Sequence, residues 1–479
     1  MNHSTLTYSP DAPTSGSCIF LIEKNGLDAL QPFLSETELT IARDAAEKGL
    51  QVACLPRIDG IVWLRILKNR TVDADYLEDL RQKGSKMLPL LKQYKVKNIA
   101  VHAPQVEAAK AYAFAEGLAL TAYVFGKYFT DASKKELPLD SITVSGPGYS
   151  AESIDELNGL VSAVCFARDM VNEPQIFLNS VQFAKEIEQA GERFGFSVDL
   201  LEKEKIESLK MGGLLAVNKA SAFPPRFAIL EWKPEQAKNT APIILVGKGV
   251  VYDTGGLSLK SPEGMELMKC DMGGAAAVVG AMAALSVNKL PLHVIGLIPI
   301  TDNAVNERAV APGDIITMYS GTTVEVVNTD AEGRLILADA LHYAKKYKPE
   351  LVIDLATLTG AAVRALGNQA ICYMGTADKE IKSQFEQAGM DTYERLVEFP
   401  LFREYGEELK SNTADLKNLG SGNAGMITAA KFLEHFTDYP WLHLDIAGVA
   451  FLRQAKTYRP KEGTGVGVRL LYHFLKNNY

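Results

Sequence analysis

Four carboxylate side chains stand beside apolar segments in the second half of this 479-residue chain: Asp253, Asp271, Asp330 and Glu332. The last two directly follow the apolar run Val324–Asn328. In open α/β sheets, ligands gather where parallel strands end, so we expect these acids to meet at one edge. Four like charges in a small buried site need neutralising, and two divalent cations would balance them. The pattern indicates a two-metal centre.

Each acid alone is a weak signal, because Asp is common in turns and at helix caps. Oxygen ligands leave the metal open among zinc, manganese and magnesium. The seven histidines contain no H-x-x-x-H pair, which excludes the zincin motif. His293 and His443 lie in apolar runs, so we expect them to be hydrogen-bonded core residues.

Other chemistries fit poorly. The chain has no G-x-S-x-G elbow, and Val246–Gly249 lacks the rest of a phosphate-binding P-loop. Five scattered cysteines without a C-x-x-C pair suit a reducing compartment. The N-terminus does not resemble a secretory signal, and the apolar stretch Gly273–Leu285 is too short to span a membrane. We therefore expect a cytoplasmic enzyme.

The hydrophobic pattern predicts an α/β protein with two domains. A turn-rich break at Ser145–Ser150 would close a smaller N-terminal α/β domain, residues 1–150, with an oligomerisation or access role. An amphipathic stretch predicts a linking helix over 151–172. Residues 173–479 alternate apolar strands with helices such as Gly273–Val287, which predicts a larger catalytic domain with a mostly parallel sheet flanked by helices.

The octapeptide Asn328–Leu335 (NTDAEGRL) matches, residue for residue, the signature of the leucyl aminopeptidase family, which includes cytosolic leucine aminopeptidase and bacterial aminopeptidase A. Further segments resemble the family in order and spacing: Val246–Gly256, Ser258–Met272, Ala311–Asp314, Asp354–Gly360 and His443–Gly448. Tyr252, Thr254 and the order Ser261-Pro262 depart from its usual pattern, which leaves fine specificity open.

The resemblance implies a two-metal aminopeptidase that uses a metal-bridging water to remove an N-terminal residue, preferably Leu or another large apolar residue. It assigns the tighter metal to Lys248, Asp253, Asp271 and Glu332. It assigns the exchangeable metal to Asp253, Asp330 and Glu332, with help from the backbone carbonyl of Asp330. The ions would be Zn²⁺ or Mn²⁺, with Mg²⁺ a further candidate at the exchangeable site.

The resemblance also implies two catalytic cations. Lys260 would stabilise the oxyanion, and Arg334 would anchor a bicarbonate ion that acts as general base. Met268, Thr357 and Gly360 would line the pocket for the substrate's first side chain. From the residues alone, Met268 and Thr357 could equally be core residues, and Arg334 could pair with a nearby acid.

Lys248 is the least expected ligand. An ammonium group has no lone pair, so this side chain must be neutral to bind a metal. Without the resemblance, a salt bridge to Asp253 is the favoured interpretation.

The resemblance implies peptide substrates with a free N-terminus, a homohexamer and no membrane association. A DNA-binding accessory role is the alternative from another class, and the net charge of −8 counts against it. A different two-metal hydrolase, such as a phosphatase, also remains open.

Overall fold

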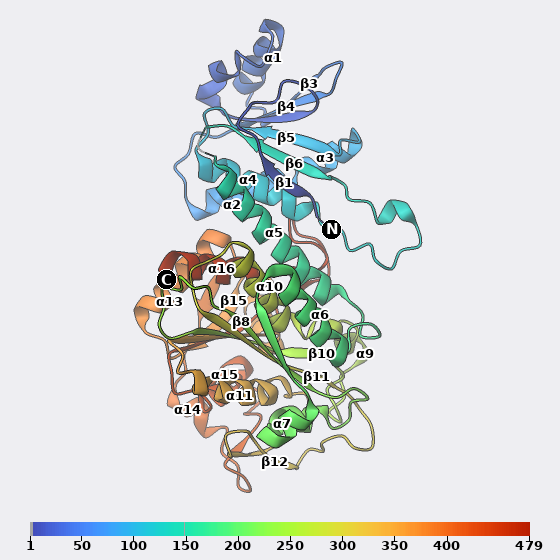
Figure 1. Ribbon diagram of the computed structural model, residues 1–479, viewed down its shortest axis with the longest axis vertical. Helices are drawn as coiled ribbons and strands as arrows, with labels where there is room; N and C mark the ends of the chain where they lie inside the picture. Colours follow the sequence, from blue (N-terminus) through green and yellow to red (C-terminus); the bar gives the residue numbers. More distant parts are fainter. Residues whose placement is uncertain (1–2, 148) are drawn as a thin grey trace. The chain divides into compact units, whose positions relative to one another are not determined.

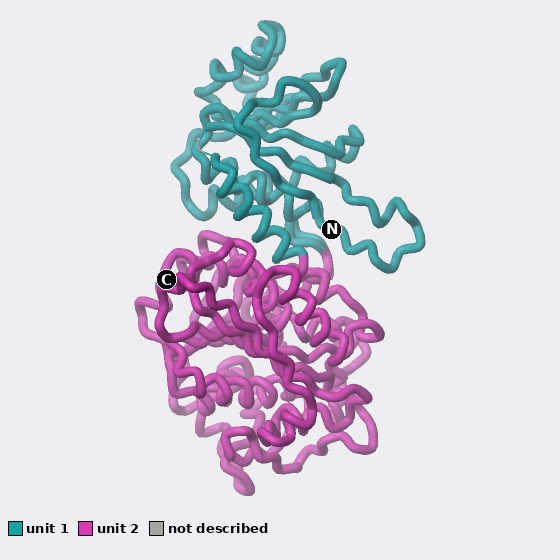
Figure 2. The backbone as a smooth tube through the Cα atoms, viewed as in Figure 1, with its two compact units in different colours: residues 1–165, 455–460 teal, residues 166–454, 461–479 magenta. Residues whose placement is uncertain are grey.

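The computed structural model describes residues 3–147 and 149–479; Gly148, within the predicted turn, lies outside the described residues. Figure 2 shows two compact units, residues 1–165 with 455–460 and residues 166–454 with 461–479. They divide within helix α5 (Ala151–Asn172), which covers the expected linking helix. The assignment of separate roles to 1–150, 151–172 and 173–479 stays a prediction.

The first unit is built on a six-stranded sheet of order β1-β6-β5-β2-β4-β3, in which only β3 and β4 pair antiparallel. Its strands are β1 (Thr5–Tyr8), β2 (Cys18–Glu23), β3 (Val52–Pro56), β4 (Ile61–Leu67), β5 (Asn98–His102) and β6 (Ser141–Ser145). Its helical segments are η1 (Lys24–Leu30), α1 (Glu36–Glu47), α2 (Ala74–Ser85), α3 (Met87–Gln93), α4 (Ala108–Thr121) and η2 (Ala132–Lys134).

The second unit holds a mixed sheet of order β16-β15-β18-β14-β9-β11-β8-β7, with β10 also paired to β11. Its strands are β7 (Ser197–Leu201), β8 (Arg226–Trp232), β9 (Ile243–Gly247), β10 (Gly249–Asp253), β11 (Val294–Asn303), β14 (Leu351–Ala356), β15 (Ile371–Gly375), β16 (Leu396–Glu398) and β18 (Trp441–Asp445). One small sheet contains β12 (Ile315–Thr317), β13 (Thr323–Glu325) and β17 (Leu416–Lys417). A second contains β19 (Phe451–Leu452) and β20 (Glu462–Gly463).

Helices cover both faces of the large sheet (Figure 1). The helical segments of this unit are α6 (Ser180–Phe194), α7 (Lys203–Leu209), α8 (Gly212–Asn218), α9 (Pro262–Met265), η3 (Met268–Cys270), α10 (Gly273–Val287), α11 (Gly333–Ala344), η4 (Lys345–Tyr347), α12 (Gly360–Leu366), α13 (Lys379–Thr392), α14 (Arg403–Glu407), α15 (Gly425–Glu434) and α16 (Val468–Asn478). Figure 1 shows α10 and α16 on one side of the sheet and α11 and α15 on the other. This confirms the predicted α/β class.

The central strands are apolar on both faces because both faces are covered. Every residue of β9 and β14 is buried. Helix α10 approaches the sheet closely because its residues are small: a Cβ on Gly274 would lie 2.0 Å from the carbonyl oxygen of Leu355. The segment Pro262–Val287 is apolar enough to cross a membrane, but 94% of its most apolar window is buried inside the fold, as in a core helix.

The strands that matter for the site run in one direction. β14, β9, β11 and β10 pair parallel, and β18 is parallel to β14. Their carboxyl ends therefore open at the same edge, where the loops that follow them can meet.

Candidate active site

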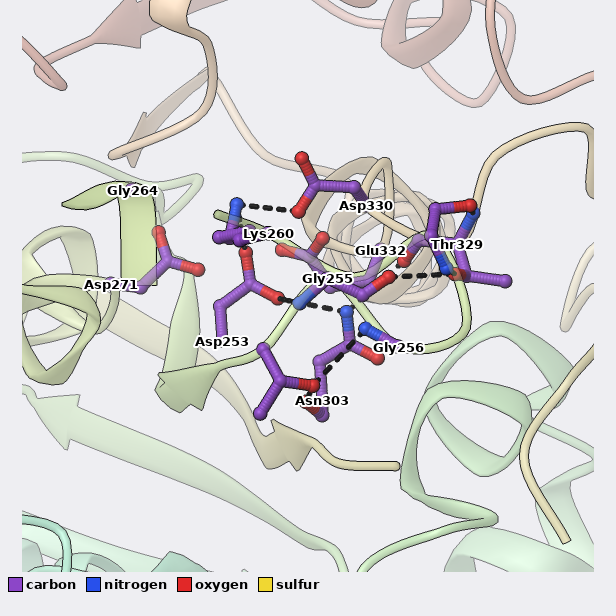
Figure 3. A network of polar contacts seen from close by, with 12 residues as sticks. Asp253, Gly255, Gly256, Lys260, Gly264, Asp271, Asn303, Thr329, Asp330 and Glu332 are labelled. Carbon is purple, nitrogen blue, oxygen red and sulfur yellow. Dashed lines mark hydrogen bonds and ion pairs between the residues drawn. The ribbon is translucent and has the colours of Figure 1, made fainter. Parts of the chain in front are cut away.

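The loops at this edge bring together the residues singled out from the sequence. Lys248 lies between β9 and β10, and Asp253 is the last residue of β10. Asp271 precedes α10, while Asp330 and Glu332 precede α11. Figure 3 shows the four carboxylates around one small space. The predicted convergence of these side chains is what the structure shows.

One half of the cluster is centred on Lys260. Its Nζ lies 2.7 Å from Asp253 Oδ2 and 2.5 Å from Asp330 Oδ1. The other oxygen of Asp253, Oδ1, accepts hydrogen bonds from the backbone N–H of Gly255 and from Asn303 Nδ2, both at 2.8 Å. These two donors fix the orientation of the Asp253 carboxylate, with Oδ2 facing the centre of the site.

The other half is centred on Lys248, which is buried. Its Nζ lies 2.7 Å from Asp271 Oδ2 and 2.8 Å from Glu332 Oε1. The salt bridge to Asp253 that the sequence alone favoured is absent among the described residues, since Asp253 is paired with Lys260 instead. Burial by itself lowers the pKa of Lys248, but the carboxylates of Asp271, Glu332 and Asp253 outweigh it and raise that pKa.

Glycines allow these approaches. A Cβ on Gly333 would lie 2.5 Å from Lys248 Cε, so a side chain there would displace the amine from Glu332. Gly255 and Gly256 have φ of +86° and +62°, a conformation that other residues rarely adopt. A Cβ on Gly255 would also lie 2.5 Å from the carbonyl oxygen of Ser258. The loop between Asp253 and Lys260 therefore depends on glycine.

The donor set fits divalent cations. Carboxylate oxygens of Asp253, Asp330 and Glu332 lie within 4.8 Å of one another. Asp271 Oδ2 and Asp330 Oδ1 are buried and have no hydrogen-bond partner among the described residues beyond their ion pairs with the lysine ammonium groups. Burial, and then repulsion by neighbouring carboxylates, raises the pKa of Asp330 and Glu332. Such an assembly of acids is one that bound cations stabilise.

Asp271 is held by a second partner. Its Oδ1 accepts hydrogen bonds from Lys248 Nζ at 2.9 Å and from the hydroxyl of Thr357 at 2.8 Å. Burial raises the pKa of Asp271. Thr357 thus contacts the cluster as well as the cavity beside it.

Arg334 is buried beside the cluster but forms no ion pair with the described acids. Its Nη1 donates to the backbone oxygen of Asn418 at 2.9 Å, while its Nε donates no hydrogen bond in the part of the chain described. Burial lowers the pKa of this guanidinium to about 10. A buried guanidinium that is only partly bonded is a suitable site for a small anion.

A cavity of about 600 Å³ opens over the cluster. Met268, Thr357 and Gly360 line it together with the cluster residues, so the structure brings the predicted pocket residues to the predicted centre. Leu358, Ala361 and Leu419 add apolar wall. Met268 and Thr357 are only partly buried, which argues against purely core roles.

Three buried polar residues near the site were not identified from the sequence. Asn418, directly after β17, accepts from the N–H groups of Val327 and Asn328 and donates to the Asn328 carbonyl at 2.7 Å. Asn303, the last residue of β11, donates to Asp253 Oδ1 and, at 3.0 Å, to the carbonyl of Thr329. Polar residues at strand ends were a usable signal for Asn303, whereas β17 is too short to be recognised.

Asp445, at the end of β18, is the third. It accepts hydrogen bonds from the N–H groups of Leu358 and Thr359 and from the Thr359 hydroxyl at 2.6 Å. It therefore holds the start of α12, which forms part of the cavity wall. His443 is fully buried and its Nδ1 lies 2.6 Å from Asp354 Oδ1, and the buried His293 bonds to Glu231, as expected of core histidines.

Comparison with known proteins agrees with this site. Residues 165–472 match the catalytic domain of the cytosol aminopeptidase family. A probable cytosol aminopeptidase of Chlorobium limicola is 45% identical over 395 residues, which cover 80% of this chain and 78% of that protein. Another probable cytosol aminopeptidase, from Geobacter sp. strain M21, is 41% identical over 406 residues, which cover 83% of this chain and 82% of that protein.

Solved structures agree as well. A tomato leucine aminopeptidase mutant superposes with a TM-score of 0.85 at 30% identity, covering 99% of this chain and 97% of that one. The bottromycin maturation enzyme BotP in complex with Mn superposes with a TM-score of 0.84 at 30% identity, covering 96% and 99%. The chain therefore belongs to the cytosol aminopeptidase family, whose members are metal-dependent aminopeptidases.

Proposed function

We propose that this aminopeptidase uses two divalent ions and bicarbonate to remove Leu or another large apolar residue from the N-terminus of peptides. The observation that carries the proposal is the convergence of Asp253, Asp330 and Glu332, with ligand oxygens within 4.8 Å of one another. Asp271 extends this group on the side of Lys248. Four carboxylates balance the charge of two dications.

The ligand sets are those that the family resemblance implies, and their members lie side by side in the two halves of the cluster. Lys248, Asp253, Asp271 and Glu332 would hold the tighter ion, and Asp253, Asp330 and Glu332 the more exchangeable one. We propose Zn²⁺ or Mn²⁺, with Mg²⁺ a further candidate at the exchangeable site; BotP was solved in complex with Mn. Lys248 must lose its proton to serve as a ligand, and two adjacent dications would favour the neutral amine over the ammonium.

The chain's own residues complete the chemistry. When bound, the two ions supply Lewis acidity that polarises a peptide carbonyl and lowers the pKa of a water molecule. Lys260 lies between Asp253 and Asp330, where its ammonium can stabilise the negative charge that develops on the carbonyl oxygen. Arg334 has unused donors and can orient bicarbonate as the group that accepts a proton.

The cavity gives a reason for the expected substrate preference. Met268, Thr357 and Gly360 form a largely apolar wall beside the acids, which suits an apolar side chain next to the scissile bond. A free α-amine close to the carboxylate cluster would restrict cleavage to the first residue of a peptide. The homohexamer and the cytoplasmic location remain predictions; the relatives are named cytosol aminopeptidases.

The test is hydrolysis of leucine p-nitroanilide by protein stripped of metal with a chelator and then supplied with Mn²⁺ or Zn²⁺. We expect the wild type to be active only after metal is restored, and Glu332→Gln to be inactive throughout. Circular dichroism checks that the wild type and the variant are both folded. The same preparations are assayed with p-nitrophenyl phosphate. Phosphatase activity without peptidase activity would contradict the proposal.

A further inference from the structure

The cavity over the carboxylate cluster has a fourth cationic residue that the proposed mechanism does not use. Arg364 lies on α12 and lines this cavity together with Gly360, four residues earlier on the same helix. Its Nη1 lies 3.4 Å from where a Cβ on Gly360 would be. The guanidinium therefore lies against the wall proposed to receive the substrate's first side chain.

No acid in the part of the chain that the structure describes balances the charge of Arg364. Lys248 and Lys260 each contact two carboxylates of the cluster, so the acids that line the cavity are already engaged. Arg334 is buried and bonds to a backbone carbonyl. Arg364, by contrast, is exposed and forms no ion pair with any residue in the ranges 3–147 and 149–479. A guanidinium without an acid partner at a substrate cavity favours an anionic group on the substrate.

We propose, as a refinement that rests on the proposed function, that Arg364 binds a substrate carboxylate and makes this enzyme favour short peptides that carry one. The planar guanidinium can bond both oxygens of a carboxylate at once. Such a carboxylate has two sources: the side chain of an acidic first residue, or the C-terminus of a dipeptide. The apolar wall and the aliphatic part of Arg364 still accommodate a large apolar side chain.

The experiment compares kcat/KM for two pairs of substrates that differ mainly in one carboxylate. Glutamyl p-nitroanilide against glutaminyl p-nitroanilide tests a carboxylate on the first residue. Leu-Gly against Leu-Gly-amide tests the C-terminal carboxylate. In at least one pair, we expect the wild-type enzyme to prefer the charged substrate, and to prefer it more strongly than the Arg364→Met variant does.

Arg364→Met keeps a side chain about as long as the aliphatic part of arginine and removes the charged guanidinium. We expect it to lower the charged-to-neutral ratio of kcat/KM about two- to fivefold, as for a partly exposed ion pair, mainly through KM. Arg364→Lys should recover part of that ratio. The matched control is Arg308→Met, because the Arg308 side chain is 77% exposed and does not line the cavity; its ratios should equal those of the wild type.

The pair in which the ratio changes identifies the source of the carboxylate. Unchanged ratios in both pairs, or an equal loss of kcat/KM on all four substrates, would overturn the proposal. An inactive wild-type enzyme on leucine p-nitroanilide would instead contradict the proposed function, so the two failures are distinguishable.

Discussion

The backbone carbonyl of Asn418 accepts a hydrogen bond from Nη1 of Arg334 at 2.9 Å, while the side-chain amide of Asn418 bonds the segment that leads to Arg334. Asn418 is fully buried and follows β17, which pairs with β13. Asn418 therefore holds both the start of the segment Asn328–Leu335 and the side chain of Arg334 within it. The position of Arg334 depends on a segment more than eighty residues away in sequence.

Asn418→Ala should impair catalysis as well as stability. The substitution leaves the N–H of Val327 and both backbone polar groups of Asn328 without their partner, which costs about 1–3 kcal/mol. The loop that carries Asp330, Glu332 and Arg334 should shift, and kcat should fall by about 10²-fold. Steady-state kinetics and urea unfolding measure the two effects.

Asn239→Ala is the control for that variant. Asn239 also bonds backbone groups through both ends of its amide, at Ala241 and His293, but it precedes β9 at the edge of the sheet away from the site. It should lose stability with kcat unchanged. A similar kcat for the Asn418 and Asn239 variants would show that Asn418 is only structural.

Asn303→Ala should weaken metal binding. Its amide is one of two donors that orient Asp253 through Oδ1, and partners of this kind commonly change metal affinity about 10–100-fold. Isothermal titration with Mn²⁺ measures the affinity directly, without reference to activity. The control is Asn306→Ala, in the loop that follows Asn303, because the Asn306 amide donates to the carbonyl of Ala220 and not to an acid of the cluster. The Mn²⁺ affinity of this variant should match that of the wild type.

Arg334→Lys keeps a positive charge but loses the planar fork of donors. If Arg334 orients bicarbonate, activity in bicarbonate-free buffer should rise when bicarbonate is added to the wild type, whereas the variant should show no rise and a kcat about 10²-fold lower. Stimulation of the variant to the same extent as the wild type would remove Arg334 from this role.

Asp339 should make stability depend on pH. Burial raises its pKa to about 7, although Oδ1 accepts from Tyr319 N and Oδ2 from Leu214 N. An acid with a raised folded-state pKa contributes stability below its unfolded pKa, and that contribution is lost as pH rises through about 7. Between pH 5 and 8 the wild type should lose about 3 kcal/mol more than Asp339→Asn, which cannot ionise.

Urea unfolding of both proteins at the two pH values gives this difference. Equal losses for the wild type and the variant would show that Asp339 does not titrate in this range.

The central elements that hold the site could be predicted because they are continuous runs of small and apolar residues, as expected of elements buried in a covered sheet. Helix α10 was expected at Gly273–Val287 and has these bounds. Acids that follow apolar strands indicated the edge where the site lies. Roles such as that of Lys248 needed the family resemblance, because a buried lysine among acids equally indicates a salt bridge.

Contacts that depend on tertiary structure could not be predicted. The partner of Lys248 was expected to be Asp253, but the fold places Asp271 and Glu332 beside its amine and Lys260 beside Asp253. Of the four ion pairs that these two lysines form, only the pair of Asp253 and Lys260 joins residues that are close in sequence. Asn418 was missed because β17 has two residues and leaves no periodic pattern.

Anomalous scattering from crystals of active protein grown with Mn²⁺ tests the two-metal centre most directly. We predict two peaks about 3.5–4 Å apart, with Asp253 and Glu332 contacting both, Asp271 contacting one and Asp330 the other. The control is that protein dissolved from these crystals still hydrolyses leucine p-nitroanilide. With that control met, a single peak within the cluster, or peaks only outside it, would contradict the two-metal centre.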